Sequence, residues 1–82
     1  MNYVELGTLL TPGGAVNFAY AEKQVKPWRC TYRGAGRYFT DPRILAGYVC
    51  GRGWIRSDQC DSLAEALQIL SAGILVVEQK QR

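Results

Sequence analysis

The sequence predicts a small α+β domain: a mostly antiparallel sheet of four or five strands, with one C-terminal helix packed on it. Three observations carry this prediction. Apolar residues alternate with polar ones over residues 15–20 and 28–32, glycine and proline mark the turns between, and one helical apolar stripe follows residue 61. A possible second short helix covers residues 42–50.

The chain has 82 residues, of which 48% are hydrophobic. This length predicts a single domain, 1–82, because a second domain would have no core of its own. The apolar content is ordinary for a globular protein. A chain this short buries only about 60% of the surface that its unfolded chain exposes and is marginally stable alone. A homodimer is therefore one expectation on size alone.

The first half of the chain is rich in strand signals. Residues 3–10 predict a strand, and Thr11-Pro12-Gly13-Gly14 predicts a tight turn. Residues 15–20 predict the second strand of a hairpin, because Val16, Phe18 and Tyr20 share one face and Asn17 the other.

A third strand is predicted at residues 28–32, after a polar connection over residues 22–27 that ends in proline. Its alternation places Trp28, Cys30 and Tyr32 on the core side, and Arg29 and Thr31 on the solvent side together with Arg33. The glycines of Gly34-Ala35-Gly36 are expected to interrupt it.

Residues 42–50 have both helix and strand character. Asp41 suits an N-cap and Pro42 the first helical position, with Gly51 as the C-terminal cap. In a helix, four apolar residues would lie on one face: Ile44, Leu45, Tyr48 and Val49. Gly47 and the Tyr48-Val49-Cys50 run favour a strand instead, and the balance favours the helix. Residues 51–53 predict a turn and residues 54–56 a short strand.

The C-terminal helix has the clearest pattern. Ser62 and Glu65 form a capping box, and Gly73 marks the expected end of the helix. Its apolar stripe consists of Leu63, Ala66, Leu67 and Leu70. Ile69 lies off this stripe, near Ala64 and Ala72, on a side of the helix that has few charged residues. This side is expected either to form a dimer seam or to be covered because the helix is wedged between sheet and loop. Residues 74–77 predict a buried strand and residues 78–82 a polar tail.

Residues 28–56 carry the strongest functional signal. Their positive charges are all arginines: Arg29, Arg33, Arg37, Arg43, Arg52 and Arg56, against the single acid Asp41, a net charge of +5. Six rings lie among them: Trp28, Tyr32, Tyr38, Phe39, Tyr48 and Trp54. Because the last 26 residues net −2, the chain is dipolar, and its basic block favours an anionic partner.

Strand alternation divides this block between core and surface. Trp28, Tyr32, Ile44 and Tyr48 are expected in the core. The residues expected to bind a partner are Arg29, Arg33, Arg37, Tyr38, Arg52, Trp54 and Arg56. A plainer interpretation makes the rings the core of a small sheet and the arginines its solvated back.

The leading hypothesis is a small non-enzymatic binding protein, an accessory or inhibitor, that docks an acidic protein surface, since arginine and aromatic side chains are enriched at interfaces. A nucleic-acid-binding domain is the first alternative, with arginines on phosphates and rings on bases. A structural homodimer without a ligand site is the second.

No enzyme, cofactor or metal site is expected. The chain has no histidine to serve as a base. Its two glycine turns, at residues 34–37 and 51–54, lack the extended patterns of nucleotide sites. Cys30, Cys50 and Cys60 form no CxxC pair and are expected to be free thiols, with no role assigned.

The first residues lack a basic segment followed by an apolar one, and no apolar run approaches the length of a membrane span. The expected setting is cytoplasmic, with no membrane partner.

Overall fold

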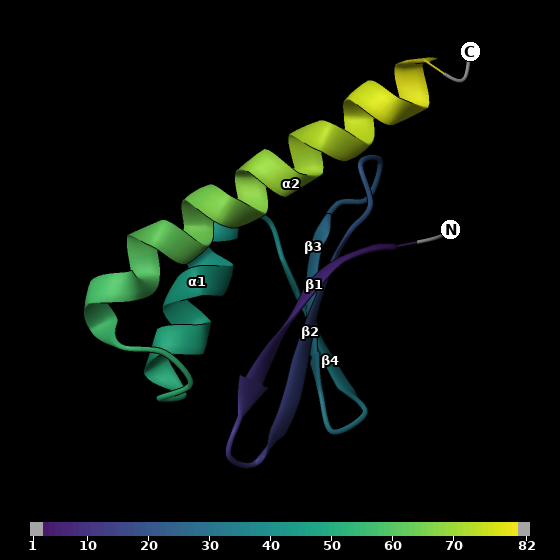
Figure 1. Ribbon diagram of the computed structural model, residues 1–82. Coiled ribbons are helices and arrows are strands. Elements are labelled where there is room, and N and C mark those ends of the chain that lie inside the picture. Colours follow the sequence, from purple (N-terminus) through teal and green to yellow (C-terminus); the bar gives the residue numbers. More distant parts are fainter. Residues whose placement is uncertain (1–2, 81–82) are drawn as a thin grey trace.

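The computed structural model describes residues 3–80, with side chains described through residue 73. It has two layers, a four-stranded antiparallel sheet and two helices on one of its faces (Figure 1). The strands are β1 (Val4–Thr11), β2 (Gly14–Tyr20), β3 (Trp28–Tyr32) and β4 (Ala35–Phe39), and they neighbour each other in chain order. The helices are α1 (Pro42–Gly51), the 3₁₀ helix η1 (Ser57–Gln59) and α2 (Cys60–Lys80). The predicted α+β class is confirmed.

The first hairpin forms as its turn residues predict. Thr11 pairs with Gly14 across Pro12 and Gly13, and Gly14 has a φ of 142°. Proline fixes the first turn angle, and glycine accepts the positive φ that other residues avoid. A register shift between Glu5 and Gly7 puts a β-bulge into β1.

The second hairpin corrects the predicted break at Gly34-Ala35-Gly36. The turn consists of Arg33 and Gly34, with φ of 52° and 81°, and Ala35 already pairs with Tyr32. Two positive φ angles define the type I′ turn that matches strand twist, so β4 resumes at once. Gly36 is a strand residue opposite Thr31.

The face of the sheet toward the helices holds the core. Its cluster of buried residues is Val16, Phe18, Trp28, Cys30, Leu45, Val49 and Leu67. Full burial of each large apolar side chain contributes about 1.5–3 kcal/mol relative to exposure. The opposite face carries Asn17, Arg29, Thr31 and Tyr38, as alternation from the core residues requires.

Helix α1 confirms the preferred interpretation of residues 42–50. The Asp41 side chain accepts a hydrogen bond of 2.8 Å from the Arg43 backbone N–H, and Pro42 starts the helix. The buried residues of α1 include Leu45, Ala46 and Val49, because α1 packs between the sheet and α2. Ile44 lies outside both contacts and is 57% exposed, so its predicted place in the core is wrong.

The predicted strand at residues 54–56 is also wrong. These residues form bends and a connection that leads into η1. The side-chain oxygen Oε1 of Gln59 accepts a hydrogen bond of 3.3 Å from the Arg56 N–H, which stabilises the start of η1. Because η1 continues directly into α2 at Cys60, Ser62 lies inside the helix and does not cap it.

The buried stripe of α2 is rotated from the predicted one. Leu67 is buried as expected and Leu63 half-buried, but Ala66 is exposed and Leu70 is 47% exposed. Ala64 and Ser71 are buried instead. Their spacing from Leu67 puts both on the same face of α2. The buried Ser71 hydroxyl donates a 2.8 Å hydrogen bond to the Gln68 carbonyl.

Helix α2 continues past its predicted end. Gly73 is helical, and the predicted strand at residues 74–77 is part of the same helix, which runs to Lys80. A short apolar run does not distinguish a buried strand from a helix. Of the predicted polar tail, residues 78–80 belong to α2 and residues 81–82 lie outside the described residues.

Candidate functional site

The end of α1 fixes the position of Trp54. Gly53, with a φ of 77°, donates its N–H to the Cys50 carbonyl at 2.9 Å, and the Trp54 N–H reaches the Val49 carbonyl at 3.3 Å. These two bonds are those of a Schellman motif with glycine at the left-handed position. The motif folds the chain back on α1, so the Trp54 ring lies 6.0 Å from the Tyr48 ring.

Four rings form a continuous row at this end of the core. The Trp54 ring lies 4.7 Å from Tyr32, and Tyr48 lies 5.4 Å from Phe39, in each case between ring centroids. Three arginines lie over this row: Arg33 over Tyr32, Arg37 over Tyr48 and Arg52 over Trp54. Arg33 is held by the Gly13 carbonyl, so the arginine–aromatic cluster is defined as the four rings with the other two arginines: Tyr32, Arg37, Phe39, Tyr48, Arg52 and Trp54. Its members come from β3, β4, α1 and the turn after α1.

The two arginines of the cluster are exposed and have no acidic partner. The Arg37 guanidinium lies 5.4 Å from the Tyr48 ring centroid, and that of Arg52 lies 5.1 Å from the Trp54 centroid. Neither side chain has an ion pair or hydrogen bond within the part of the chain that the structure describes. The rings hold the guanidinium groups in place by cation–π attraction of about 0.5–1 kcal/mol each, and their donors remain available.

Arg37 reaches the cluster because of its register. It pairs with Cys30, whose side chain is buried beneath the helices, so Arg37 points to the same face. The sequence predicts Arg37 as a partner-binding residue at the glycine turn of residues 34–37, and Tyr48 and Tyr32 in the core. The structure makes Tyr48 and Tyr32 half-buried residues that pack on the core and line the site.

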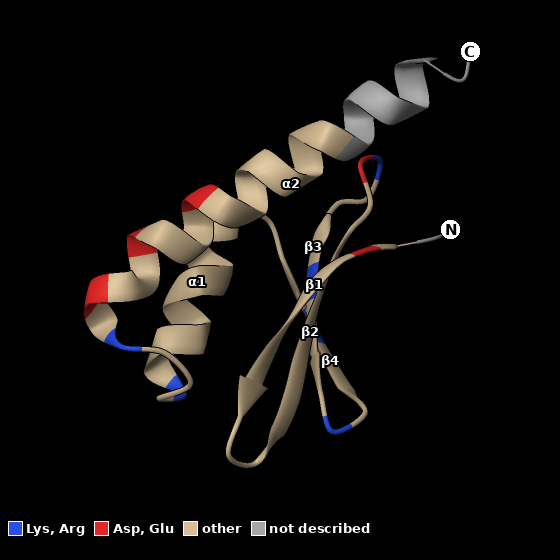
Figure 2. Ribbon diagram, viewed as in Figure 1, with Lys and Arg blue, Asp and Glu red and all other residues tan. Residues whose placement is uncertain are grey.

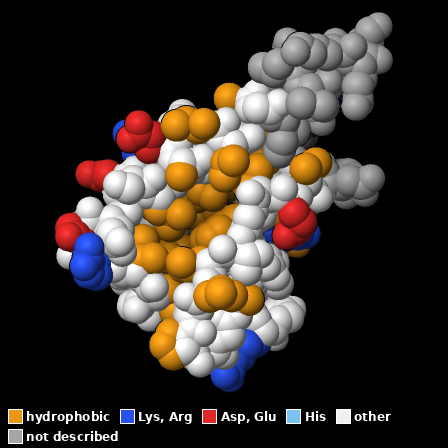
Figure 3. All heavy atoms as spheres, viewed as in Figure 1, with side chains coloured by type: hydrophobic (Ala, Val, Ile, Leu, Met, Phe, Trp, Pro, Cys, Tyr) orange, Lys and Arg blue, Asp and Glu red, His pale blue; other side chains and the backbone are white. Residues whose placement is uncertain are grey.

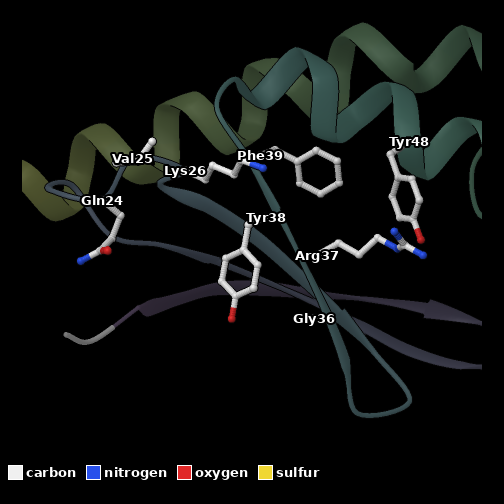
Figure 4. Close-up of a pocket in the computed structure, with 8 residues that line it drawn as sticks. All are labelled: Gln24, Val25, Lys26, Gly36, Arg37, Tyr38, Phe39 and Tyr48. Carbon is white, nitrogen blue, oxygen red and sulfur yellow. The ribbon is translucent and has the colours of Figure 1, made fainter.

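Two cavities share Arg37 and Tyr48. The larger has a volume of about 640 Å³ and is lined by residues 24–26, the β4 residues 36–39, and Tyr48 (Figure 4). The smaller, of about 100 Å³, lies among Cys30, Tyr32, Ala35, Arg37, Tyr48, Arg52 and Trp54. Neither lining contains an acidic side chain, whereas both contain two cations. Both hollows therefore favour an anionic group.

Two predicted site residues lie on the opposite face of the sheet. Arg29 pairs across the strands with Tyr38, and both contact Tyr3, whose ring is 5.6 Å from Tyr38 and 4.9 Å from the Arg29 guanidinium carbon. The Arg29 guanidinium forms an ion pair with Glu5 at 3.1 Å. The structure thus separates Arg29 and Tyr38 from Arg37, Arg52 and Trp54.

Arg33 and Arg56 have local partners. Arg33 donates from Nε and Nη2 to the Gly13 carbonyl, at 3.0 and 2.7 Å, and so joins the two hairpin turns. A side chain at Gly13 would collide with the Tyr32 hydroxyl, which explains the glycine there. Arg56 pairs with Asp58 at 3.2 Å. Figure 2 shows acidic positions along the first turns of α2.

The surroundings of Cys30 and Cys50 favour the protonated thiol. Burial raises the pKa of Cys30, although the Arg37 charge opposes this. The pKa of Cys50 is raised by desolvation, then by its hydrogen bond with Cys60 and by the nearby Asp58 and Asp61 carboxylates. Since the thiolate is the nucleophile, neither environment activates the sulfur.

Among the described residues, no group of three or more cysteine or carboxylate side chains is placed to hold a metal ion. Within the same part of the chain, no helix combines the length and hydrophobicity that crossing a membrane requires.

Comparison of this chain with protein-family models, curated protein sequences and solved structures finds no match.

Proposed function

We propose that this chain is a non-enzymatic binding protein that docks an acidic surface of a partner protein through the arginine–aromatic cluster. The observation that carries the proposal is the pair Arg37 and Arg52. Both are exposed, both lie over rings, and neither has a carboxylate partner among the described residues. A guanidinium fork matches a carboxylate with two parallel hydrogen bonds, and ring contact limits the entropy lost on binding.

The composition of the cluster supports a protein partner over a nucleic acid. Arginine, tyrosine and tryptophan dominate interface hot spots. Tight nucleic-acid binding usually requires many phosphate contacts, whereas Arg29, Arg43 and Arg56 already have carboxylate partners. Tyr48 and Trp54 also pack against the core, which limits the ring face available to a base.

The surroundings of the thiols support the absence of catalysis. Cys30 is 2% exposed and its pKa is raised, so the sulfur nearest the cluster is neither accessible nor ionised. The three free cysteines fit a reducing compartment, which supports the cytoplasmic setting expected from the sequence.

An NMR titration separates the two classes of partner. Labelled protein is titrated with a capped glutamate-rich peptide and, separately, with a mixed-sequence single-stranded oligonucleotide of equal charge. We expect the peptide to shift the Trp54 indole N–H signal and the Arg37 and Arg52 Nε–H signals. Stronger binding of the oligonucleotide, with a steep loss on adding salt, would support the nucleic-acid alternative instead.

An apolar surface favours self-association as a second property. Figure 3 shows hydrophobic side chains gathered across the hollow between the helices and β1. Val4 of β1 and Leu70 of α2 are exposed, and Leu6 and Leu9 of β1 are half-buried and packed against the core. Contiguous exposed apolar surface marks interaction sites, so we propose that a second copy covers it.

Sedimentation velocity tests the self-association. We expect a dimer at about 0.1 mM protein, and a monomer for the Leu70→Glu variant under the same conditions. A wild-type chain that sediments as a monomer throughout would contradict this second proposal and leave the first untouched.

A further inference from the structure

Strand β4 is an edge of the sheet. It pairs with β3 only, and no other strand of the described chain pairs with it. In a two-residue hairpin the residues that flank the turn, here Tyr32 and Ala35, exchange backbone hydrogen bonds, and such pairs alternate along the strands. Arg37 therefore directs its backbone groups to β3, whereas Gly36 and Tyr38 direct theirs outward.

The larger cavity follows this edge. Four consecutive residues of β4, residues 36–39, line it, so it borders both faces of the strand (Figure 4). The Tyr38 ring points to one side and the Arg37 and Phe39 side chains to the other, with residues 24–26 at one end of the strand. There is thus space beside β4 where the unpaired backbone groups point.

The charge along the edge selects its occupant. Lys26 and Arg37 line the larger cavity, Arg52 lines the adjoining one, and no acidic side chain lines either. The other edge of the sheet, β1, differs: the bulge between Glu5 and Gly7 interrupts it, and no β1 residue lines either cavity.

We propose that β4 accepts an extended acidic segment of the partner protein as a fifth strand. The segment would bond to the outward N–H and C=O groups of Gly36 and Tyr38, the mode known as β-strand addition. Alternate residues of a strand share a face. Acidic side chains at every second position of the bound segment would therefore reach Arg37 and Arg52. This inference rests on the proposed function and specifies the conformation and charge pattern of the bound segment.

A capped octapeptide of alternating threonine and glutamate serves as the probe, and its threonine–glutamine counterpart as the control. We expect the glutamate peptide to bind and the glutamine peptide not to bind. Binding should slow hydrogen exchange at the Gly36 and Tyr38 amides by about tenfold or more. The Arg37 and Phe39 amides, already bonded to β3, should change little.

N-methylated versions of the probe test the backbone contact without altering the protein. Methylation of every second amide removes the donors on one edge of the peptide. We expect one methylation pattern to abolish binding and the complementary pattern to retain it.

The outcomes separate this inference from the proposed function. One set of results overturns strand addition alone. In that case the glutamate peptide binds, and its binding depends on Arg37 and Arg52, but both methylated peptides bind equally well and amide hydrogen exchange at Gly36 and Tyr38 does not change. That result leaves the acidic docking intact. Absence of binding, or binding unaffected by Arg37→Gln/Arg52→Gln, overturns both.

Discussion

Gly53 is the single residue on which the site most depends. Its left-handed conformation, with a φ of 77°, completes the Schellman motif and places Trp54 against Tyr48. Gly51, two residues earlier, lies within α1 and has no such conformation. An added Cβ has open space at both positions, so only backbone preference separates the two glycines.

These two glycines are expected to respond to alanine in opposite ways. Gly53→Ala should lower the free energy of unfolding by about 1–2 kcal/mol, because alanine resists positive φ. Gly51→Ala should raise it by up to about 1 kcal/mol, because alanine is the better helix former. Urea denaturation of both variants measures the difference. Equal effects of the two substitutions would contradict the assigned cap.

Asp41 gives the fold a pH dependence. The Arg43 backbone N–H, and then the Arg43 side chain, hold the pKa of the Asp41 carboxyl below its ordinary value of 3.8. A carboxyl whose pKa is lowered on folding stabilises the native state above the unfolded pKa. This stabilisation is lost as the pH falls through the lowered value.

The Asp41→Asn variant tests this pH dependence, because asparagine caps helices as well as aspartate does. We expect wild-type stability to fall on acidification below about pH 4, and the variant to lose less over the same range. Urea denaturation at several pH values provides the comparison. Parallel curves for the two proteins would contradict a contribution from the Asp41 charge.

At the scale of the elements, α2 shows what periodicity predicts and what it misses. The sequence predicts the helix and the burial of Leu67, but a stripe drawn through Ala66 and Leu70 assumes packing on a sheet. The helix packs mainly on α1, and the face that it buries runs through Ala64, Leu67 and Ser71. The buried face of a helix depends on its neighbour, which local pattern does not identify.

Paired substitutions in α2 test the rotated stripe. Leu67→Ala should lower the free energy of unfolding by about 2–5 kcal/mol, because it removes a buried side chain. Leu70→Ala should cost less than about 1 kcal/mol, because Leu70 is 47% exposed. Denaturant unfolding measures both. Similar losses would instead favour the stripe predicted from sequence, with Leu70 buried.

The β4 hairpin shows a second limit of local pattern. Glycine at residues 34 and 36 predicts an interruption, yet Arg33 takes the left-handed conformation with Gly34 and the strand resumes at Ala35. Non-glycine residues seldom adopt positive φ. Because the sequence pattern does not predict β4, it also does not predict the pairing register that turns Arg37 toward Tyr48. The cluster therefore could not be predicted from the sequence.

At the scale of the whole molecule, the basic block of the sequence becomes two surfaces and several local contacts. Of the seven residues predicted to bind a partner, the structure brings together Arg37, Arg52 and Trp54. Arg29 and Tyr38 lie on the other face, while Arg33 and Arg56 are engaged by Gly13 and Asp58. Composition predicts a preference for an anionic partner, whereas only the fold distinguishes available arginines from engaged ones.

The central claim is that Arg37 and Arg52, rather than net charge, create the binding site. The most direct measurement compares Arg37→Gln/Arg52→Gln with Arg43→Gln/Arg56→Gln. Both double variants remove two exposed charges, but the second pair already has carboxylate partners in the fold.

Calorimetric titration with the threonine–glutamate octapeptide provides the affinity of each double variant, and circular dichroism checks that both are folded. We predict that the first variant loses about tenfold or more in affinity, and that the second stays within about threefold of wild type. Equal losses in the two variants would contradict the account, because the attraction would then follow charge alone.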